Sequence, residues 1–269
     1  KVQGHAMRAN TAALCRAAEE VWGVRSPQSI HYCWFGGGPI GEADRKCMES
    51  WKKYCPDYKI IEWNDQNFEI STNRYAQQAY EAKKYAFVSD YVRLAVVYEY
   101  GGIYLDTDVE LVRPLDELLE LPGFMGFQNN NEVATGLGFG ACKGNPVVQA
   151  LLRDYDALDF IKADGSVDLT PCPERNTKVL QTLGVRVDGT RQSIAEMEIF
   201  PAEYFCPMEF ATRKLRVTPK TYSIHRYAES WKPKPSAVSR ILQRLLKKHY
   251  YTWYCPLRGR IEGRLRKRT

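Results

Sequence analysis

Two aspartates, Asp106 and Asp108, stand two positions apart in the stretch YLDTDV, directly after a run of apolar residues. On an extended chain residues i and i+2 project to the same side, so both carboxylates would face one point in space. Two carboxylates at such close range repel each other unless a cation or a donor-rich ligand lies between them. Hard oxygen ligands suit Mg²⁺ or Mn²⁺, which commonly keep open positions for substrate phosphates. The pair therefore predicts a divalent metal site that would stabilise a departing diphosphate.

Two other interpretations of the pair stay open. Aspartates are common in a solvated turn after a strand, which is the plain structural alternative. The stretch YLDTDV also fits the signature of aspartyl-phosphate phosphohydrolases, with Asp106 as the nucleophile and the stretch DGSVD, 164–168, as the later acidic motif. In that family the signature ends the first strand of the domain, whereas more than a hundred residues precede it here. The sequence therefore favours the metal site.

The elements that must position these acids alternate along the chain. Apolar and β-branched runs predict short strands, and apolar residues at helical intervals predict the helices between them. We expect strands at 30–35, 59–64 and 103–112 and helices at 41–58 and 75–102. Such alternation predicts an α/β fold with a mostly parallel central sheet flanked by helices. Since ligands bind beyond the carboxyl ends of the strands in such sheets, the ends of the first and third strands would meet in one crevice.

The second half of the chain continues the pattern less regularly. Short apolar stretches broken by glycine and asparagine over 124–146 predict strands and loops, and 145–158 has the spacing of a helix. A proline-rich turn precedes a further helix within 169–185, and a late strand and loop are expected within 198–207.

Cysteine usage and hydropathy favour an intracellular protein. The eight cysteines include no CxxC pair, so we expect reduced thiols in a cytosolic compartment, with neither a zinc site nor a disulfide framework. No apolar run approaches the roughly 18 to 20 residues that span a bilayer. Residues 1–29 lack the basic-then-apolar pattern of a signal peptide, so export is not expected.

Charge divides the chain into three expected segments. Residues 232–269 hold 12 Lys and Arg and a single Glu, so their net charge is about +11, which leaves about −5 for residues 1–231. We therefore expect an N-terminal segment at 1–29, a catalytic domain at 30–231 and a basic amphipathic tail at 232–269. One helical face of this tail is apolar, at Val238, Ile241, Leu242, Leu245 and Leu246. The tail would contact an anionic membrane surface or pack on the body as a terminal helix, while nucleic acid is an unlikely partner.

Three separated stretches, IHYCWFGG, SDYVRLAVVYEYGGIYLDTD and SIHRYAESW, resemble the DXD glycosyltransferases of the sugar-binding-region type, the family 32-like group. That group includes bacterial capsular polysaccharide and lipooligosaccharide sugar transferases, α-1,6-mannosyltransferases and α-1,4-galactosyltransferases, with the clostridial glucosylating toxins as distant relatives. The resemblance covers roughly residues 30–231. It implies a GT-A-like nucleotide-diphospho-sugar transferase fold and Mn²⁺ (or Mg²⁺) as the cofactor.

The resemblance also implies how a donor would be bound. Trp34 would stack on the nucleotide base, and Tyr104 would line the nucleotide site. Asp90 and Arg93 would hold the hydroxyls of the donor sugar. Asp106 would contact both ribose and sugar. Plainer alternatives are a core role for Trp34 and a surface ion pair between Asp90 and Arg93.

The remaining implied roles concern the metal and the diphosphate. Asp108 would be the direct metal ligand, with Asp106, His225 and Ser230 completing the set, and Trp231 would meet the diphosphate. We expect Asp106 and Asp108 to be the catalytic acids. A structural histidine is the plainer interpretation of His225. Close bacterial relatives often carry histidine at the position of Arg226, although an arginine can still serve a phosphate.

The implied function is metal-dependent, retaining transfer of a hexose from a nucleotide-diphosphate sugar, with UDP-galactose or UDP-glucose favoured. The acceptor would be a hydroxyl of a glycan or lipid-linked molecule in surface polysaccharide synthesis, on the cytoplasmic face of a cell membrane. The chain shows no separate carboxylate pair for a covalent intermediate, so a same-face displacement is expected. A non-catalytic sugar-nucleotide-binding protein is the third hypothesis. Side chains that could line the reacting centre are Gln128, Asn129, Asn130, Asn131, Glu174 and Asn176.

Overall fold

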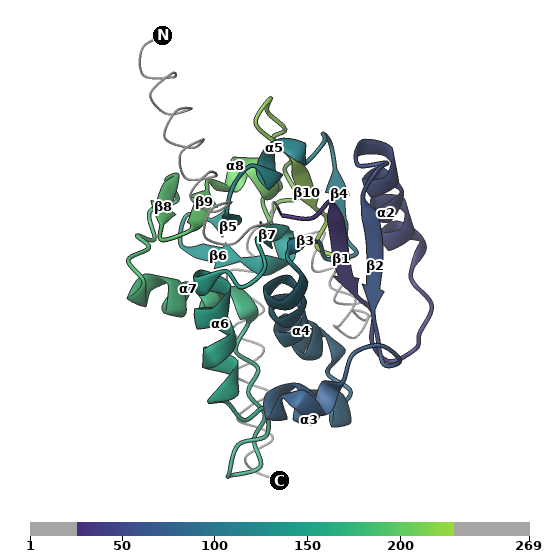
Figure 1. Cartoon of the computed structure of the whole chain (residues 1–269), viewed down its shortest axis with the longest axis vertical. Helices are drawn as coiled ribbons and strands as arrows, with labels where there is room; N and C mark the ends of the chain where they lie inside the picture. Colours follow the sequence, from purple (N-terminus) through teal and green to yellow (C-terminus); the bar gives the residue numbers. More distant parts are fainter. Residues whose placement is uncertain (1–25, 229–269) are drawn as a thin grey trace. The chain divides into compact units, whose positions relative to one another are not determined.

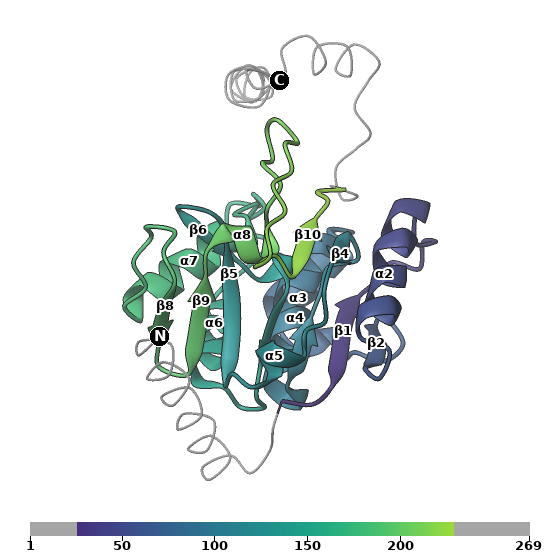
Figure 2. The same ribbon diagram turned by 90° about the horizontal axis from the view of Figure 1, so that it is seen from above.

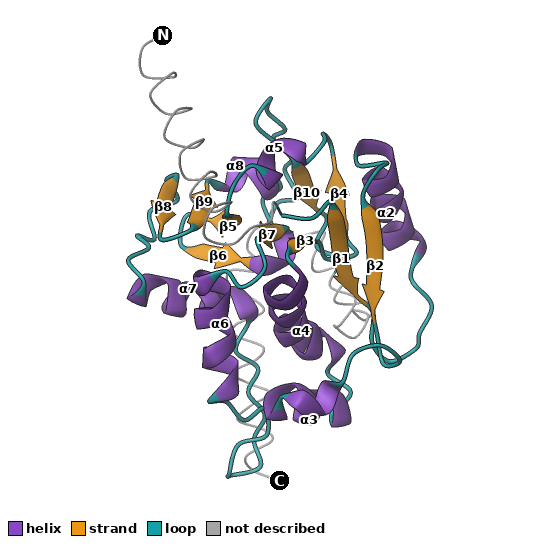
Figure 3. Cartoon of the chain, viewed as in Figure 1, coloured by secondary structure: helices purple, strands orange, loops and turns teal. Residues whose placement is uncertain are grey.

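The structure is a computed structural model that describes residues 26–228 of the 269-residue chain. Two compact units divide these residues, the larger one comprising 26–207 and 217–228. Within the described part of the smaller unit, 208–216, Met208 and Leu215 form an isolated antiparallel bridge. The rest of the description concerns the larger unit, whose strands and helices are distinguished in Figures 1 and 3.

The larger unit is built on an eight-stranded sheet with the order β2-β1-β3-β7-β5-β9-β8, and β6 pairs with β5. Strand β1 pairs in parallel with β2 and β3, as β5 does with β9, and the remaining pairs are antiparallel. It follows that β1, β2, β3, β5 and β9 point one way and β6, β7 and β8 the other. The strands are β1 Ser29–Cys33, β2 Lys59–Trp63, β3 Gly102–Tyr104, β5 Gly123–Asn129, β6 Glu132–Ala134, β7 Phe139–Ala141, β8 Gln192–Ile194 and β9 Met197–Phe200.

Helices cover both faces of this sheet, and the prediction of an α/β fold with a mostly parallel sheet flanked by helices is confirmed. The helices are α2 Glu42–Tyr54, α3 Arg74–Glu81, α4 Tyr85–Tyr100, α5 Asp116–Leu119, α6 Pro146–Asp156, α7 Cys172–Thr182 and α8 Ala202–Phe205, with 3₁₀ turns at Ile70–Thr72 and Thr135–Leu137. No described helix is both long and apolar enough to cross a bilayer. The cysteines between 26 and 228 are buried and carry reduced thiols, at Cys33, Cys47, Cys55, Cys142, Cys172 and Cys206.

The single helix expected over 75–102 is two helices. Helix α3 ends at Glu81, Lys83 adopts a left-handed conformation with φ of 56°, and α4 begins at Tyr85. Alanines and apolar residues continue at helical intervals through this break, so the periodicity alone does not reveal it. The first strand also ends at Cys33 rather than at Phe35.

The prediction of one continuous strand over 103–112 is wrong, because a turn that contains the two acids interrupts it. Strand β3 ends at Tyr104, and a turn follows in which the backbone N–H of Val109 donates to the carbonyl of Asp106 at 3.0 Å. Strand β4, Val109–Leu111, then leaves the main sheet and pairs antiparallel with β10, Ser223–His225. Asp106 and Asp108 therefore lie in a turn between two strands, and strand periodicity is not what orients them.

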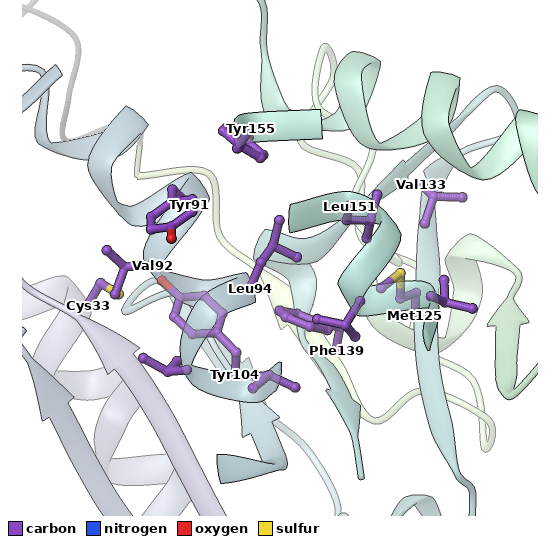
Figure 4. Packing of buried hydrophobic residues seen from close by; sticks show 14 of the residues in the cluster. Cys33, Tyr91, Val92, Leu94, Tyr104, Met125, Val133, Phe139, Leu151 and Tyr155 are labelled. Atoms are coloured by element: carbon purple, nitrogen blue, oxygen red, sulfur yellow. The ribbon is translucent and has the colours of Figure 1, made fainter. Parts of the chain in front are cut away.

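Two apolar clusters form the core, one on each face of the sheet. Alternation along the strands assigns side chains to the two faces, as in β3, where Ile103 packs with Trp51 of α2 and Tyr104 packs with Leu94 of α4. The cluster on the α4 face is shown in Figure 4, where Tyr104, Leu94 and Phe139 lie close together. Removing each such side chain from water contributes roughly 1.5–3 kcal/mol. Tyr104 is thereby anchored two residues before Asp106.

Candidate active site

The structure brings Asp106, Asp108 and His225 together. One ligand atom from each of these residues lies within 4.8 Å of the others, and no second group of this kind occurs within residues 26–228. Asp108 Oδ1 and His225 Nε2 are 3.3 Å apart. The approach is a result of strand pairing, because His225 of β10 stands opposite Val109 of β4.

Asp108 is held as an ionised carboxylate. Its Oδ2 accepts a hydrogen bond from the backbone N–H of Ala228 at 2.8 Å, and its carbonyl accepts one from Arg226 N–H at 2.9 Å. Burial alone would raise the pKa of Asp108, but the charge and hydrogen bond of His225 and the Ala228 N–H bring it below the usual value. The pKa of His225, which burial would lower, is raised mainly by Asp108.

Asp106 has different partners from Asp108. Its Oδ1 accepts a hydrogen bond from Tyr104 OH at 2.9 Å and pairs with Arg93 Nη2 at 3.2 Å. Burial raises the pKa of Asp106, Arg93 opposes the rise, and the charge of Asp108 adds to it. The two acids of the motif are therefore unequal, since one is bound to a guanidinium and the other to an imidazole.

Arg93 connects this acid to helix α4. Its Nη2 also lies 3.1 Å from Asp90 Oδ1, and its Nε donates to the carbonyl of Ser89 at 3.1 Å. The side chains of Arg93 and Asp90 are only 6% and 12% exposed, which rules out the alternative of a surface ion pair. Burial raises the pKa of Asp90 to about 6 although Arg93 opposes it.

Gly136 sets the space around these groups. A Cβ at this position would lie 2.3 Å from Asp106 Oδ2 and 2.9 Å from Arg93 Nη1, closer than real contacts allow. The carbonyl of Gly136 also accepts from the backbone N–H of Asp106 at 3.4 Å. A side chain here would displace the Asp106 carboxylate or the Arg93 guanidinium, and nothing in the sequence distinguishes Gly136 from the glycines around it.

The donor set fits a hard divalent cation. Two carboxylates and an imidazole suit Mn²⁺ or Mg²⁺ and leave coordination positions for other oxygens. His225 also has a buried Nδ1 without a hydrogen-bond partner. The cation itself is not identified by these residues.

Of the side chains expected near the reacting centre, Asn176 lies next to the site. Its Nδ2 donates to Thr135 Oγ1 at 3.0 Å and approaches Cys172 Sγ at 3.6 Å, the same sulfur that lies 3.9 Å from Arg93 Nη1. The Oδ1 of Asn176 is buried without a partner. Asn176 thus belongs to a buried polar group that borders Arg93.

The other expected side chains are engaged elsewhere. Glu174 is exposed and pairs with Lys178 at 2.7 Å. Gln128 and Asn129 both donate to Glu132 Oε2, at 2.7 and 2.9 Å, within the β5–β6 hairpin. In the same hairpin the N–H of Asn131 donates to Asn129 Oδ1 at 2.8 Å. The neighbouring Asn130 Oδ1 would lie 2.8 Å from a Cβ added at Gly189.

Trp34 follows β1 at its carboxyl end and is half-buried. Its indole N–H donates to the carbonyl of Gly38 at 2.5 Å, which fixes the ring against the glycine turn. Gly36 in that turn has φ of 84°, and a Cβ there would lie 2.2 Å from the ring of Tyr85. The position suits a ring that stacks on a base, and that role stays a prediction.

Asp44 is an acid near the site that the sequence did not indicate. It lies buried in the first turn of α2, and its Oδ1 accepts from Thr107 Oγ1 at 3.4 Å. Burial and then the charge of Asp108 raise the pKa of Asp44. In the sequence it looks like an ordinary acid at a helix N-terminus, so no local signal distinguishes it.

Several expected residues are not part of this group. Asp168 pairs with Arg175 at 2.7 Å, and Asp164 accepts hydrogen bonds from Ser166, so DGSVD supplies no acid to the three-residue group. Ser230 and Trp231 lie outside the described residues, as does the basic tail.

Residues 41–124 match the family described as "Glycosyltransferase sugar-binding region containing DXD motif". This part of the chain is therefore similar to the sugar-binding region of the DXD glycosyltransferases, and the resemblance given by its motifs is confirmed.

Three relatives with assigned names match parts of the chain. Inositol phosphoceramide mannosyltransferase 3 of Schizosaccharomyces pombe is 27% identical over 168 residues, covering 59% of this chain and 42% of the relative. The mannosyl phosphorylinositol ceramide synthase SUR1 of Saccharomyces cerevisiae is 34% identical over 127 residues, covering 45% and 32%. The human alpha-1,4-N-acetylglucosaminyltransferase is 26% identical over 148 residues, covering 55% and 38%. The matches thus span less than half the length of each relative.

Two solved structures are similar at a lower level. The PaToxG glycosyltransferase matches with a TM-score of 0.43 and 18% identity, covering 68% of this chain and 80% of that one. A glycosyltransferase involved in glycosylation of the major capsid of PBCV-1 matches with a TM-score of 0.36 and 11% identity, covering 65% and 83%.

Proposed function

We propose that this protein is a metal-dependent glycosyltransferase that moves a hexose from a nucleotide-diphosphate sugar to a hydroxyl group. The observation that carries the proposal is the convergence of Asp106, Asp108 and His225 within 4.8 Å. The two aspartates lie within the residues that match the family, and His225 stands on the strand that pairs with β4 of that region. The buried Asp90 and Arg93 lie directly beside Asp106, so a metal site and a polar site adjoin.

The two acids would have separate tasks. Asp108 and His225 would be the main ligands of Mn²⁺ or Mg²⁺, and Asp106 would be a further ligand. The bound cation would neutralise the charge that develops on a departing diphosphate. Arg93 and Asp90 offer donors and acceptors suited to sugar hydroxyls, and Tyr104 and Trp34 would line the nucleotide site. Ser230 and Trp231 remain proposed partners of the metal and the diphosphate.

Retention at the anomeric carbon is part of the proposal. A covalent route needs a free carboxylate beside the reacting carbon. Asp106 is poorly suited to that task, because its Oδ1 is engaged by Tyr104 and Arg93. A same-face displacement, in which the departing phosphate oxygen helps to deprotonate the acceptor, requires only positioning and charge stabilisation from the protein.

The donor and acceptor are proposed by class. The resemblance of the motifs to those of bacterial sugar transferases favours UDP-galactose or UDP-glucose as the donor. In contrast, two relatives are named for the transfer of mannose and one for that of N-acetylglucosamine. The mannosyl relatives carry ceramide lipids in their names, which supports a lipid-linked acceptor. Surface polysaccharide synthesis at the cytoplasmic side of a membrane, with 232–269 as the basic membrane contact, completes the proposal. Unchanged liposome flotation after deletion of 232–269 would contradict that contact.

One assay tests the transferase against the two alternatives. Purified protein is incubated with Mn²⁺ and each of UDP-galactose, UDP-glucose, UDP-N-acetylglucosamine and GDP-mannose, with and without glycan and lipid-linked acceptors, and nucleotide release is measured. Release that disappears with chelator and in Asp108→Ala supports the transferase. Tight donor binding without turnover on any acceptor would indicate a sugar-nucleotide-binding protein. Phosphate release from monoesters that depends on Asp106 would indicate the phosphohydrolase.

A further inference from the structure

Helix α2 lies along the free edge of β4, the strand that follows the two acids, and Figure 2 shows α2, β4 and β10 in this order. The other edge of β4 pairs with β10, where Arg226 N–H donates to Asp108 and Val112 N–H donates to Tyr222, each at 2.9 Å. In an antiparallel pair alternate residues turn their backbone groups away from the partner strand. Val109 and Leu111 therefore direct their backbone groups toward α2.

Side chains of α2 satisfy this free edge. The indole N–H of Trp51 donates to the carbonyl of Val109 at 2.7 Å, and the N–H of Leu111 donates to Ser50 Oγ at 2.8 Å. In the turn just before β4, Thr107 Oγ1 donates to Oδ1 of Asp44, which also belongs to α2, at 3.4 Å. Helix α2 thus contacts residues 107, 109 and 111, at every second position from the turn into the strand.

Val109 is the position on which both proposed metal ligands depend. Asp108 directly precedes it, and His225 stands opposite it in the β4–β10 register. A displacement of Val109 would therefore change the approach of Asp108 Oδ1 to His225 Nε2, which is 3.3 Å. The bond from Trp51 fixes Val109 from the side that β10 leaves free.

Trp51 is itself held rigidly. It is completely buried, and its ring packs edge-on against Tyr32 of β1 with 5.8 Å between the ring centroids. The indole therefore links the main sheet to the separate strand β4. An apolar side chain would be enough to fill this space. The indole N–H does more, because its hydrogen bond is directional and so fixes where the Val109 carbonyl lies.

We propose that Trp51, supported by Ser50, is a positioning residue of the metal site. Its indole N–H holds Val109 so that Asp108 and His225 converge on one divalent cation. The inference rests on the proposed function, because it assumes that these two residues bind the metal. Partners outside the ligand shell typically change metal affinity by 10–100-fold when removed. Trp51 acts through a backbone carbonyl, so we expect a loss near the lower limit.

The test measures Mn²⁺ affinity of the full chain by isothermal titration calorimetry, without any nucleotide sugar. Trp51→Phe removes the N–H and keeps an aromatic ring. The matched control is Trp63→Phe, which loses an indole hydrogen bond to His31 Nδ1 of 3.0 Å in the main sheet. We expect about tenfold weaker Mn²⁺ binding in Trp51→Phe, and an affinity like that of the native protein in Trp63→Phe, even if both melt at lower temperature.

Unchanged Mn²⁺ affinity in a folded Trp51→Phe would overturn the inference and leave the proposed function intact. If that variant does not fold, Ser50→Ala supplies the second test. It removes the acceptor of Leu111 N–H, and otherwise only the bond that the same hydroxyl donates to the Cys47 carbonyl within α2. Weaker Mn²⁺ binding in Ser50→Ala supports the positioning role of α2, and unchanged binding contradicts it. A native protein that binds no Mn²⁺ would contradict the metal site itself, and with it both proposals.

Discussion

The buried Arg93 and the partly exposed Asp106 form an ion pair, Nη2 to Oδ1 at 3.2 Å, that joins helix α4 to the turn carrying the two acids. Asp90 Oδ1 lies 3.1 Å from the same guanidinium nitrogen. One buried arginine therefore compensates two carboxylates. This arrangement makes Arg93 important for stability as well as for the proposed binding of a donor.

Replacing Arg93 with methionine should be strongly destabilising, because Asp90, whose side chain is 12% exposed, and the partly exposed Asp106 would both lose their cation. Removing one partner of such a pair typically costs about 3–5 kcal/mol of unfolding free energy. Urea denaturation at neutral pH would measure this loss. The control is Arg186→Met, whose partner Asp188 is exposed at the surface, where an ion pair contributes little to stability. Equal losses in the two variants would contradict the view that Arg93 is essential to the buried network.

Gly136→Ala should damage activity more than stability. The added methyl would lie 2.3 Å from Asp106 Oδ2, so the carboxylate or the turn must shift. Overpacking of this kind costs about 1–3 kcal/mol, and a displacement of about 1 Å at a reacting centre can lower the rate about 100-fold. Donor turnover and thermal melting should be measured on the same samples. For stability the control is Gly38→Ala, where nothing lies within 4 Å of the added Cβ.

The sequence located the main groups of the site but not the contacts that support them. Asp106, Asp108, Arg93 and His225 lie in recognisable motifs, and the structure brings all four together. No motif distinguishes Gly136, whose importance comes from the space between Asp106 and Arg93. Such roles depend on distances across the fold, which residue spacing along the chain does not encode.

The turn that holds the two acids could not be predicted from the sequence either. An apolar run followed by alternating residues predicts one strand through 103–112, yet the hydrogen bond from Val109 N–H to the Asp106 carbonyl closes a turn there. The prediction failed because β4 pairs with β10, more than a hundred residues later. Pairing between such distant segments overrides a local strand pattern.

Cation binding should stabilise the folded protein. Any ligand that binds only the folded state stabilises it by about 2.7 kcal/mol when present at 100 times its dissociation constant. We expect Mn²⁺ to raise the melting temperature and chelator to reverse the rise. Asp108→Asn should remove the Mn²⁺ effect, while Glu174→Gln, which alters an exposed pair with Lys178, should keep it. A rise in melting temperature that persists in Asp108→Asn would place the cation elsewhere.

His31 should make folding stability depend on pH in a defined window. Its Nδ1 accepts from the indole N–H of Trp63 at 3.0 Å, so the Nε2 proton donates to the carbonyl of Gly101 at 2.9 Å. A second proton, on Nδ1, would point at the N–H of Trp63, so two donors would oppose each other and this hydrogen bond would be lost. Burial lowers the pKa of His31 to about 4, and the charge of Lys59 contributes in the same direction. The folded protein therefore holds a neutral imidazole with both nitrogens satisfied.

The sign of the effect follows from proton binding. Below pH 6.5 the unfolded chain protonates this histidine while the folded protein does not until about pH 4, so stability is full above pH 6.5 and decreases as the pH falls between these values. The total loss should be about 3 kcal/mol, from 1.36 kcal/mol for each unit of pKa. Since other groups also titrate, the measurement is the difference in unfolding free energy between native protein and His31→Gln, from pH 4 to 8. Glutamine can replace both hydrogen bonds without titrating, so a difference that does not change with pH would show that His31 is protonated equally in both states.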